Sequence, residues 1–100
     1  MNWYIYLIRC ENNSLYTGIT TDLKKRFNAH KIGKGAKYTK IFKPVRIEVA
    51  FEVENKSSAL KVEIYIKKKA VSQKTQLINF PEDFVQEIKN ILGIEILKIN

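Results

Sequence analysis

The chain has 100 residues, a single cysteine and a formal net charge of +8 at pH 7. This length fits one domain with a small core. No apolar run approaches the ~18 residues that cross a membrane, and residues 1–3 do not begin a signal peptide, so we expect a cytoplasmic protein. One thiol, Cys10, cannot form an internal disulfide, which excludes a disulfide framework and fits a reducing compartment.

The positive charge is concentrated in two places. Lysine or arginine recurs every third residue from 31 to 46, and residues 67–69 are three lysines in a row. A basic surface can serve solubility alone, but clustering of this kind favours phosphate binding and therefore a nucleic-acid partner. The residues predicted to contact nucleic acid are Lys34, Lys37, Tyr38, Lys40 and Lys67.

Residues 3–20 predict a β-hairpin, because aromatic and β-branched segments flank a turn cluster at residues 11–14. A two-residue loop would place Tyr6 and Tyr16 on opposite faces. A three-residue loop at 11–13 would place both on one face, with Tyr6 opposite Gly18. In that register the missing side chain of Gly18 leaves room for a ligand, so cooperation between the tyrosines requires an odd loop.

A helix follows the hairpin. Thr20 or Thr21 can cap it and Gly33 can end it. Within this helix Arg26 and His30 are separated by one turn, so their side chains point the same way. Residues 32–44 then predict a basic loop, and residues 45–53 predict a third strand.

The second half of the chain is predicted to be mainly helical. A helix runs from Asn55 or Ser57 to about Ala70, with Glu63 inside an apolar stripe formed by Leu60, Ile64 and the stem of Lys67, flanked by Ala59 and Ile66. Ser72 is the expected cap of a short helix to Leu77. Another helix opens at Pro81 and ends at Gly93, and residues 94–99 form a short strand or a packed tail.

Five side chains could hydrolyse a phosphodiester together. Arg26 can clamp phosphate oxygens, Tyr6 can accept a proton from water, and His30 can orient water or share the proton transfer. Glu63 alone could hold Mg²⁺, because this ion keeps most of its waters and takes one or two protein carboxylates. Tyr16 lies on the expected tyrosine face.

Each of these residues also has a structural interpretation. Tyrosines in strands commonly pack with a wet hydroxyl, Arg26 can be solvated, His30 can be structural, and Glu63 can pair with Lys67 at i,i+4. The residues alone therefore support a small, basic α+β domain that binds nucleic acid.

The order of the segments resembles the GIY-YIG nuclease superfamily, and especially its small stand-alone bacterial members. The resemblance spans roughly residues 2–77 and comprises residues 3–10, 14–23, Arg26, His30, 33–39, 44–45, 58–60 and Glu63. The first triplet reads Tyr-Ile-Tyr and the second Tyr-Thr-Gly, so both tyrosines are kept. Asn79 is the nearest match to a late asparagine that many members use.

The resemblance implies a three-stranded antiparallel sheet flanked by helices, and we expect this domain to span residues 1–79. Residues 80–100 have no counterpart in the family, and their pattern predicts a helical extension packed on the same domain. The resemblance also implies residue roles. Tyr6 is the general base, Tyr16 lies near the attacked phosphate, Arg26 is the catalytic arginine, His30 is the residue one turn later, and Glu63 binds one Mg²⁺ or Mn²⁺ ion.

The expected function is a metal-dependent endonuclease that acts on DNA in repair or recombination, with RNA as an alternative partner. Cutters of the superfamily often carry a further DNA-binding domain, which this chain lacks, so structure rather than sequence would direct cleavage. The alternative is a non-catalytic nucleic-acid-binding module on the same scaffold. We expect a monomer, although residues 84–92 could form a dimer surface if the core does not cover them.

Overall fold

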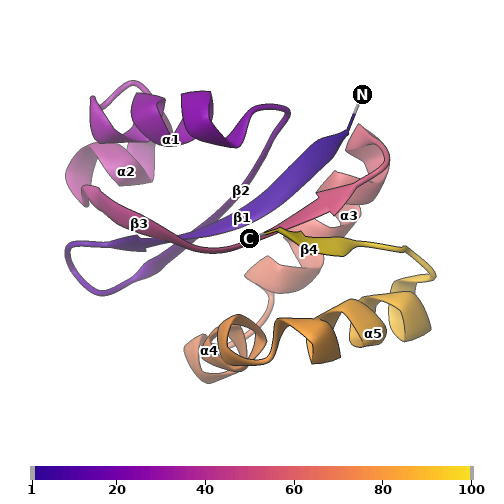
Figure 1. The fold of residues 1–100 in the computed structure, drawn as a ribbon. Coiled ribbons are helices and arrows are strands. Elements are labelled where there is room, and N and C mark those ends of the chain that lie inside the picture. The colour runs from indigo at the N-terminus through magenta and orange to yellow at the C-terminus, as the bar shows by residue number, and fades with distance from the viewer. Residues whose placement is uncertain (1, 100) are drawn as a thin grey trace.

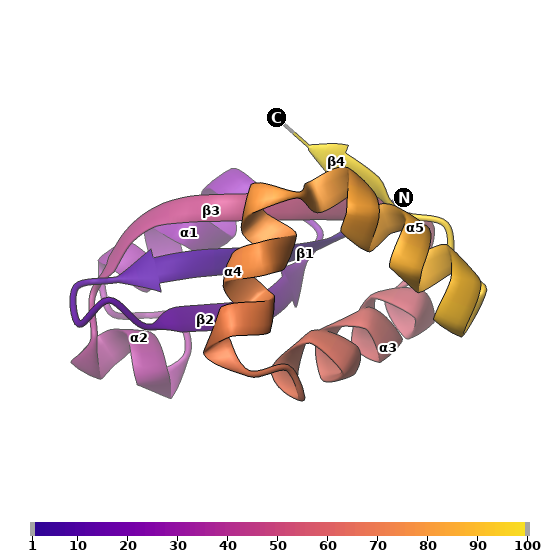
Figure 2. The ribbon, with the colours of Figure 1, turned by 90° about the horizontal axis from the view of Figure 1, so that it is seen from below.

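The computed structural model describes residues 2–99, which form a four-stranded antiparallel sheet with helices on both faces (Figure 1). The strands are β1 (Trp3–Cys10), β2 (Leu15–Thr20), β3 (Pro44–Val53) and β4 (Leu97–Ile99), in the order β2-β1-β3-β4. The helices are α1 (Leu23–Lys31), α2 (Lys37–Ile41), α3 (Lys56–Lys67), α4 (Val71–Asn79) and α5 (Pro81–Leu92). Helices α1 and α2 lie on one face, and α3, α4 and α5 lie on the other (Figures 1 and 2).

The central position of β1 explains its uninterrupted apolar segment. Ile5 and Leu7 join the larger core, which includes the buried residues of α3, α4 and α5. Tyr6 and Ile8 point to the opposite face and join a smaller cluster, against which Leu23, Phe27 and Phe42 pack. Because neighbouring residues of a strand alternate between faces, a strand covered on both sides needs apolar residues at successive positions.

The sheet has four strands instead of the predicted three. The fourth, β4, pairs with β3 through Ala50–Ile99, Phe51–Lys98 and Glu52–Leu97. Gly93 ends α5 with φ 66°, a left-handed conformation that glycine adopts without a Cβ penalty. The chain then returns to the free edge of β3. The prediction of an antiparallel sheet flanked by helices is confirmed. The fourth strand lies within residues 94–99, for which the sequence predicted either a short strand or a packed tail.

Two predictions for the face that α1 and α2 cover were wrong in detail. The side chain of Asp22 caps α1 by accepting a hydrogen bond from the backbone of Lys25 at 3.0 Å, so neither Thr20 nor Thr21 is the cap. The basic segment predicted as a loop contains the short helix α2. Its backbone bonds are local, and the apolar pattern is too short to have indicated a helix.

The predicted core stripe of α3 was also wrong. Leu60 and Ile64 are exposed, whereas Ala59, Val62 and Ile66 are buried. The spacing of 59, 62 and 66 is itself helical, and β-branched Val62 and Ile66 fill the space under the sheet. Asn55 caps this helix and is one of the two residues at which it was predicted to start. Helix α4 begins after Ala70, not at Ser72, and continues to Asn79.

Residues 80–99 complete the larger core. Phe84 and Ile88 of α5 are buried, as is Ile96, whereas Ile91 is 60% exposed. Two of the apolar residues that could have formed a dimer surface, Phe84 and Ile88, are thus already covered. The division into 1–79 and an extension from residue 80 stays a prediction. Among residues 2–99, no helix is long and apolar enough to cross a bilayer.

Candidate active site

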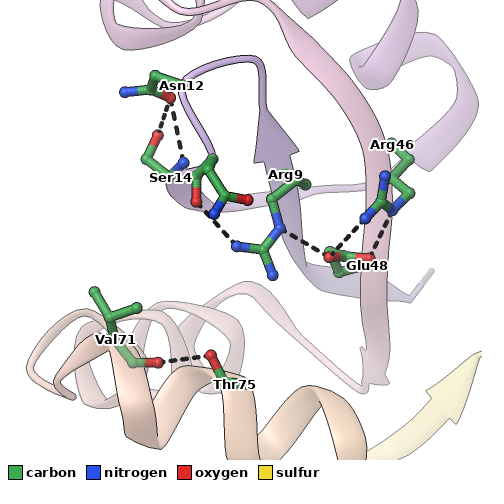
Figure 3. A network of polar contacts seen from close by, with 8 residues as sticks. Arg9, Asn12, Ser14, Arg46, Glu48, Val71 and Thr75 are labelled. Atoms are coloured by element: carbon green, nitrogen blue, oxygen red, sulfur yellow. Dashed lines mark hydrogen bonds and ion pairs between the residues drawn. The ribbon is translucent and has the colours of Figure 1, made fainter.

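The hairpin adopts the three-residue loop that cooperation between the tyrosines requires. Tyr6 pairs with Gly18 and Arg9 with Leu15, so residues 11–13 form the loop. Asn13 takes a positive φ of 66°. Arg9 donates to the carbonyl of Asn13 at 3.0 Å and to Glu48 of β3 at 2.9 Å (Figure 3). These bonds attach the loop to the sheet and fix the register.

Glu48 is the anchor of this loop support. Arg46 also donates to it, at 2.9 Å (Figure 3). Although burial favours the neutral acid, hydrogen bonds from Arg46 and Arg9 hold the pKa of Glu48 below its usual value. The carboxylate therefore stays charged at neutral pH and keeps both arginines in place.

The space over Gly18 is filled by Tyr6, which corrects the expectation that it admits a ligand. A Cβ placed on Gly18 would lie 2.6 Å from Cζ of Tyr6 and 3.1 Å from the Tyr16 ring. Tyr6 is only 1% exposed, and its ring centroid lies 6.4 Å from that of Tyr16. The glycine is thus needed for the Tyr6 ring to lie across β2, and the two phenols share one face as predicted.

Helix α1 supplies two partners to the Tyr6 hydroxyl. Nε2 of His30 lies 2.9 Å from it, and Nε of Arg26 donates to it at 3.4 Å. Both residues face the sheet because they are one turn apart on the helix. The structure therefore brings Tyr6, Tyr16, Arg26 and His30 together, with the His30 ring centroid 5.3 Å from that of Tyr16.

The charges of this cluster are set by burial and by Arg26. Burial raises the pKa of Tyr6, hydrogen bonding and charge from Arg26 oppose the rise, and Tyr16 and Glu63 add to it. Burial and the Arg26 charge lower the pKa of His30 to about 4. At neutral pH the cluster therefore holds a protonated phenol beside a neutral imidazole and a permanent cation.

The segment after α1 closes over the other side of the imidazole. Nδ1 of His30 lies 2.7 Å from Oγ1 of Thr39, which is 1% exposed on α2. Gly35 permits this approach, since a Cβ there would lie 2.8 Å from Cγ and 2.9 Å from Cα of His30. His30 is completely buried as a result.

An aromatic stack connects this cluster to the surface. The ring of Tyr38 on α2 stacks on Tyr16, with centroids 6.1 Å apart and an interplanar angle of 21°. Its hydroxyl donates to Ser14 at 2.5 Å and accepts from Asn12 at 3.4 Å. Tyr38 is 37% exposed. The predicted nucleic-acid contacts Lys34, Lys37 and Lys40 are exposed on the same segment.

Glu63 approaches from a different element. It lies on α3, which packs on the face of the sheet opposite α1 and contacts β1 and β2 (Figure 1). Its side chain is 15% exposed, and its carboxylate pairs with Lys67 at 3.4 Å, as the structural interpretation predicted. Its charge nevertheless contributes to the raised pKa of Tyr6. The carboxylate therefore interacts electrostatically with Tyr6, although no hydrogen bond joins them among the described residues.

The donor set around Glu63 suits only one kind of metal site. Residues 2–99 contain no group of three or more His, Cys, Asp or Glu side chains placed to hold an ion. A multidentate cage of the zinc or calcium type is therefore not built from these side chains. A single hard carboxylate fits a hydrated Mg²⁺ or Mn²⁺ ion that takes its remaining ligands from water and substrate. The late asparagine candidate, Asn79, is exposed at the end of α4.

Sequence reasoning missed the support around His30 and Tyr38. Neither Thr39 and Gly35 nor Ser14 and Asn12 received a role. The signal was present in part, because residues 33–39 belong to the resemblance. Only the folded α2 shows that Thr39 points inward while Lys37 and Lys40 point outward.

The chain is similar to known proteins over most of its length. Residues 2–76 match the family model of the GIY-YIG catalytic domain. A UPF0213 protein of Fusobacterium nucleatum is 42% identical over 99% of this chain and 99% of its own, and one of Cupriavidus necator is 51% identical over 72% of this chain and 78% of its own.

A solved relative extends the comparison to structure. The solution NMR structure of a UPF0213 protein from Bacillus halodurans has a TM-score of 0.53 and 38% identity, and the match covers 80% of this chain and 85% of that one. The predicted resemblance to small stand-alone proteins of this kind is confirmed. The chain belongs to the GIY-YIG family.

Proposed function

We propose that the protein is a metal-dependent endonuclease that hydrolyses phosphodiester bonds in DNA. The observation that carries the proposal is the position of the Tyr6 hydroxyl, which lies between the Arg26 guanidinium and the neutral His30 imidazole. A packing tyrosine needs one partner for its hydroxyl. A hydroxyl held between a cation and an imidazole is arranged for proton transfer.

Tyr6 can serve as the base through a relay. Its raised pKa keeps the phenol protonated at neutral pH, so it cannot accept a proton unless it releases one. As the water attacks phosphorus, its proton passes to the Tyr6 oxygen and the phenolic proton passes to Nε2 of His30, 2.9 Å away. The negative charge of the bound phosphodiester opposes the effect of Arg26 on the imidazole and favours this transfer.

Arg26 and Tyr16 would position the phosphate. Arg26 uses Nε toward Tyr6 and also interacts with the Tyr16 side chain, and the further N–H donors of its guanidinium can contact phosphate oxygens. Glu63 would hold the metal, and a bound Mg²⁺ supplies positive charge at the phosphate and at the leaving oxygen. The exposed Lys34, Lys37 and Lys40, with Lys67 on α3, would contact flanking phosphates and Tyr38 a flanking nucleotide.

A panel of cleavage substrates tests this proposal. Single-stranded, nicked and branched DNA, their RNA counterparts and duplexes of varied sequence are incubated with Mg²⁺ or Mn²⁺. Tyr6→Phe keeps the buried ring and removes the hydroxyl, so we expect a loss of about 10²- to 10⁴-fold. Glu63→Gln should also abolish turnover, with Glu54→Gln, an exposed carboxylate on the loop before α3, as the matched control. Wild-type rates in both site variants would refute the assignment.

A non-catalytic nucleic-acid-binding module is the second candidate, and the Lys67–Glu63 ion pair favours it, because a carboxylate neutralised by lysine has less need of a metal. This candidate predicts salt-sensitive binding without turnover in either metal. Multiple turnover by protein free of contaminating nuclease excludes it. We propose further that the protein acts as a monomer in the cytoplasm, on substrates recognised by structure in repair or recombination.

A further inference from the structure

The imidazole of His30 has two hydrogen-bonded nitrogens and, when neutral, one proton to place on them. Nε2 faces the Tyr6 hydroxyl at 2.9 Å and Nδ1 faces the Thr39 hydroxyl at 2.7 Å. The proton transfer from Tyr6 requires a free lone pair on Nε2, so the proton must be on Nδ1. Which nitrogen carries the proton depends on the hydrogen bond that the other nitrogen makes.

The Thr39 hydroxyl has a single proton, and a backbone carbonyl competes for it. Oγ1 of Thr39 lies 2.9 Å from the carbonyl oxygen of Ala36, which can only accept. If the threonine proton goes to this carbonyl, Oγ1 is left as an acceptor toward His30. Nδ1 must then carry the imidazole proton and donate it to Oγ1.

One contact favours the opposite tautomer. The backbone N–H of Ala36 points to Nδ1 at 3.4 Å, which would suit an unprotonated nitrogen. This distance exceeds the 2.7–3.2 Å typical of N–H donors, whereas the two Thr39 distances fall within the normal range. The two shorter bonds form a continuous chain from imidazole to hydroxyl to carbonyl, and they outweigh the longer one.

We propose that Thr39 is a positioning residue that fixes the His30 proton on Nδ1 and so leaves Nε2 free to take the Tyr6 proton. Gly35 supports this role, because a side chain there would collide with His30 and push the segment away from the ring. Helix α2 also carries the exposed Lys37 and Lys40. The same short helix thus presents lysines to the nucleic acid and a hydroxyl to the histidine.

The chain contains one histidine, which makes the tautomer directly measurable. Protein labelled with ¹⁵N-histidine gives ring signals by NMR that can come from no other residue, and the shifts and proton couplings identify the protonated nitrogen. The wild type and Thr39→Ser, which keeps the hydroxyl, should show a protonated Nδ1 and a free Nε2. Thr39→Val, which keeps the shape, should populate the tautomer protonated on Nε2.

The kinetic arm rests on the proposed hydrolysis. Thr39→Val should lower kcat at least about tenfold, since a histidine in the wrong tautomer is a poor proton acceptor. KM should be unchanged because Thr39 is buried, and Thr39→Ser should restore kcat. Thr75→Val is the matched control. Thr75 also donates its hydroxyl to a backbone carbonyl, that of Val71 at 3.0 Å, on the other face of the sheet (Figure 3).

The two arms fail separately. A wild-type ring protonated on Nε2, or a Thr39→Val ring with the wild-type tautomer, overturns the proposal whether or not the protein cuts nucleic acid. A kcat loss in Thr39→Val without a tautomer change also overturns it, because the threonine would then act only on structure. Absence of cleavage in the wild type refutes the proposed function and leaves the NMR result to decide the role of Thr39. If Thr39→Val does not fold, the tautomers of wild type and Thr39→Ser decide it.

Discussion

The two faces of the sheet bury different kinds of side chain. The face under α3, α4 and α5 buries an almost entirely apolar cluster that includes Leu7, Phe51 and Ile66. The face under α1 and α2 buries the hydroxyl of Tyr6, the imidazole of His30 and the hydroxyl of Thr39. Buried polar groups cost stability unless they are hydrogen-bonded, and these three are bonded to one another in sequence. One face therefore supplies stability, which permits the other to hold groups suited to chemistry.

Arg26→Ala should give the largest contrast between a loss of cleavage activity and a change in the free energy of unfolding. We expect cleavage to fall about 10³-fold, equivalent to about 4 kcal/mol of transition-state stabilisation, because the variant removes the cation beside Tyr6 and the phosphate. The free energy of unfolding should change by less than about 1 kcal/mol, since Arg26 is only partly buried. Single-turnover kinetics and urea titration measure the two quantities. Lys24→Ala, exposed on the same helix, is the control, and a large stability loss in Arg26→Ala would contradict the comparison.

Phe84→Ala should show the reverse pattern. Phe84 is 2% exposed and its ring centroid lies 5.3 Å from that of Phe51. Removing a buried aromatic ring leaves a cavity and should lower the free energy of unfolding by about 3–4 kcal/mol. At temperatures where the variant stays folded, kcat should be unaffected. Ile91→Ala on the exposed side of α5 is the control, with a change within about 0.5 kcal/mol. A kcat loss in folded Phe84→Ala would show that the two faces are coupled.

The buried His30 should make the free energy of unfolding depend on pH in the acidic range. Its pKa falls from an ordinary 6.5 to about 4 in the folded protein. Between these values the unfolded chain binds a proton that the folded chain does not, so stability is complete above pH 6.5 and falls as the pH drops toward 4. The loss should reach on the order of 3 kcal/mol.

Urea titration of the wild type and His30→Gln across this range checks the prediction. The variant should lack the part of the slope that His30 contributes. Glu48 and Glu87 have lowered pKa values, so their contributions to the free energy of unfolding are also lost as the pH falls. Both proteins contain these glutamates, and the difference between wild type and His30→Gln therefore isolates His30. Parallel pH profiles for wild type and variant would contradict the assigned pKa.

The same contrast between faces explains what the sequence could reveal. Hairpin register was predictable on one condition, because period-two alternation requires an odd loop if both tyrosines share a face, and the structure has that loop. Tyr6, Tyr16, Arg26 and His30 could be identified because strand and helix periods place them on one side.

Features that depend on tertiary packing were not predictable. The buried stripe of α3 is Ala59, Val62 and Ile66, whereas the equally apolar Leu60 and Ile64 are exposed, and local periodicity does not distinguish the two. Strand β4 exists because β3 has a free edge for it. The room over Gly18 was misjudged because nothing in the sequence shows that the Tyr6 ring crosses β2 to fill it.

Lys67 provides the smallest and sharpest test, because it is both the predicted phosphate contact and the observed partner of Glu63. Its amino group is 3.4 Å from the carboxylate and its side chain is 52% exposed, so Lys67→Met should change the free energy of unfolding by no more than about 0.5 kcal/mol. If Lys67 contacts nucleic acid, the slope of log Kd against log salt should become shallower by about one. Exposed Lys68→Met, next along the chain, controls for general charge. An unchanged slope with tighter Mg²⁺ binding would instead assign Lys67 to Glu63 alone, because removing the lysine removes a cation that competes with the metal for one carboxylate.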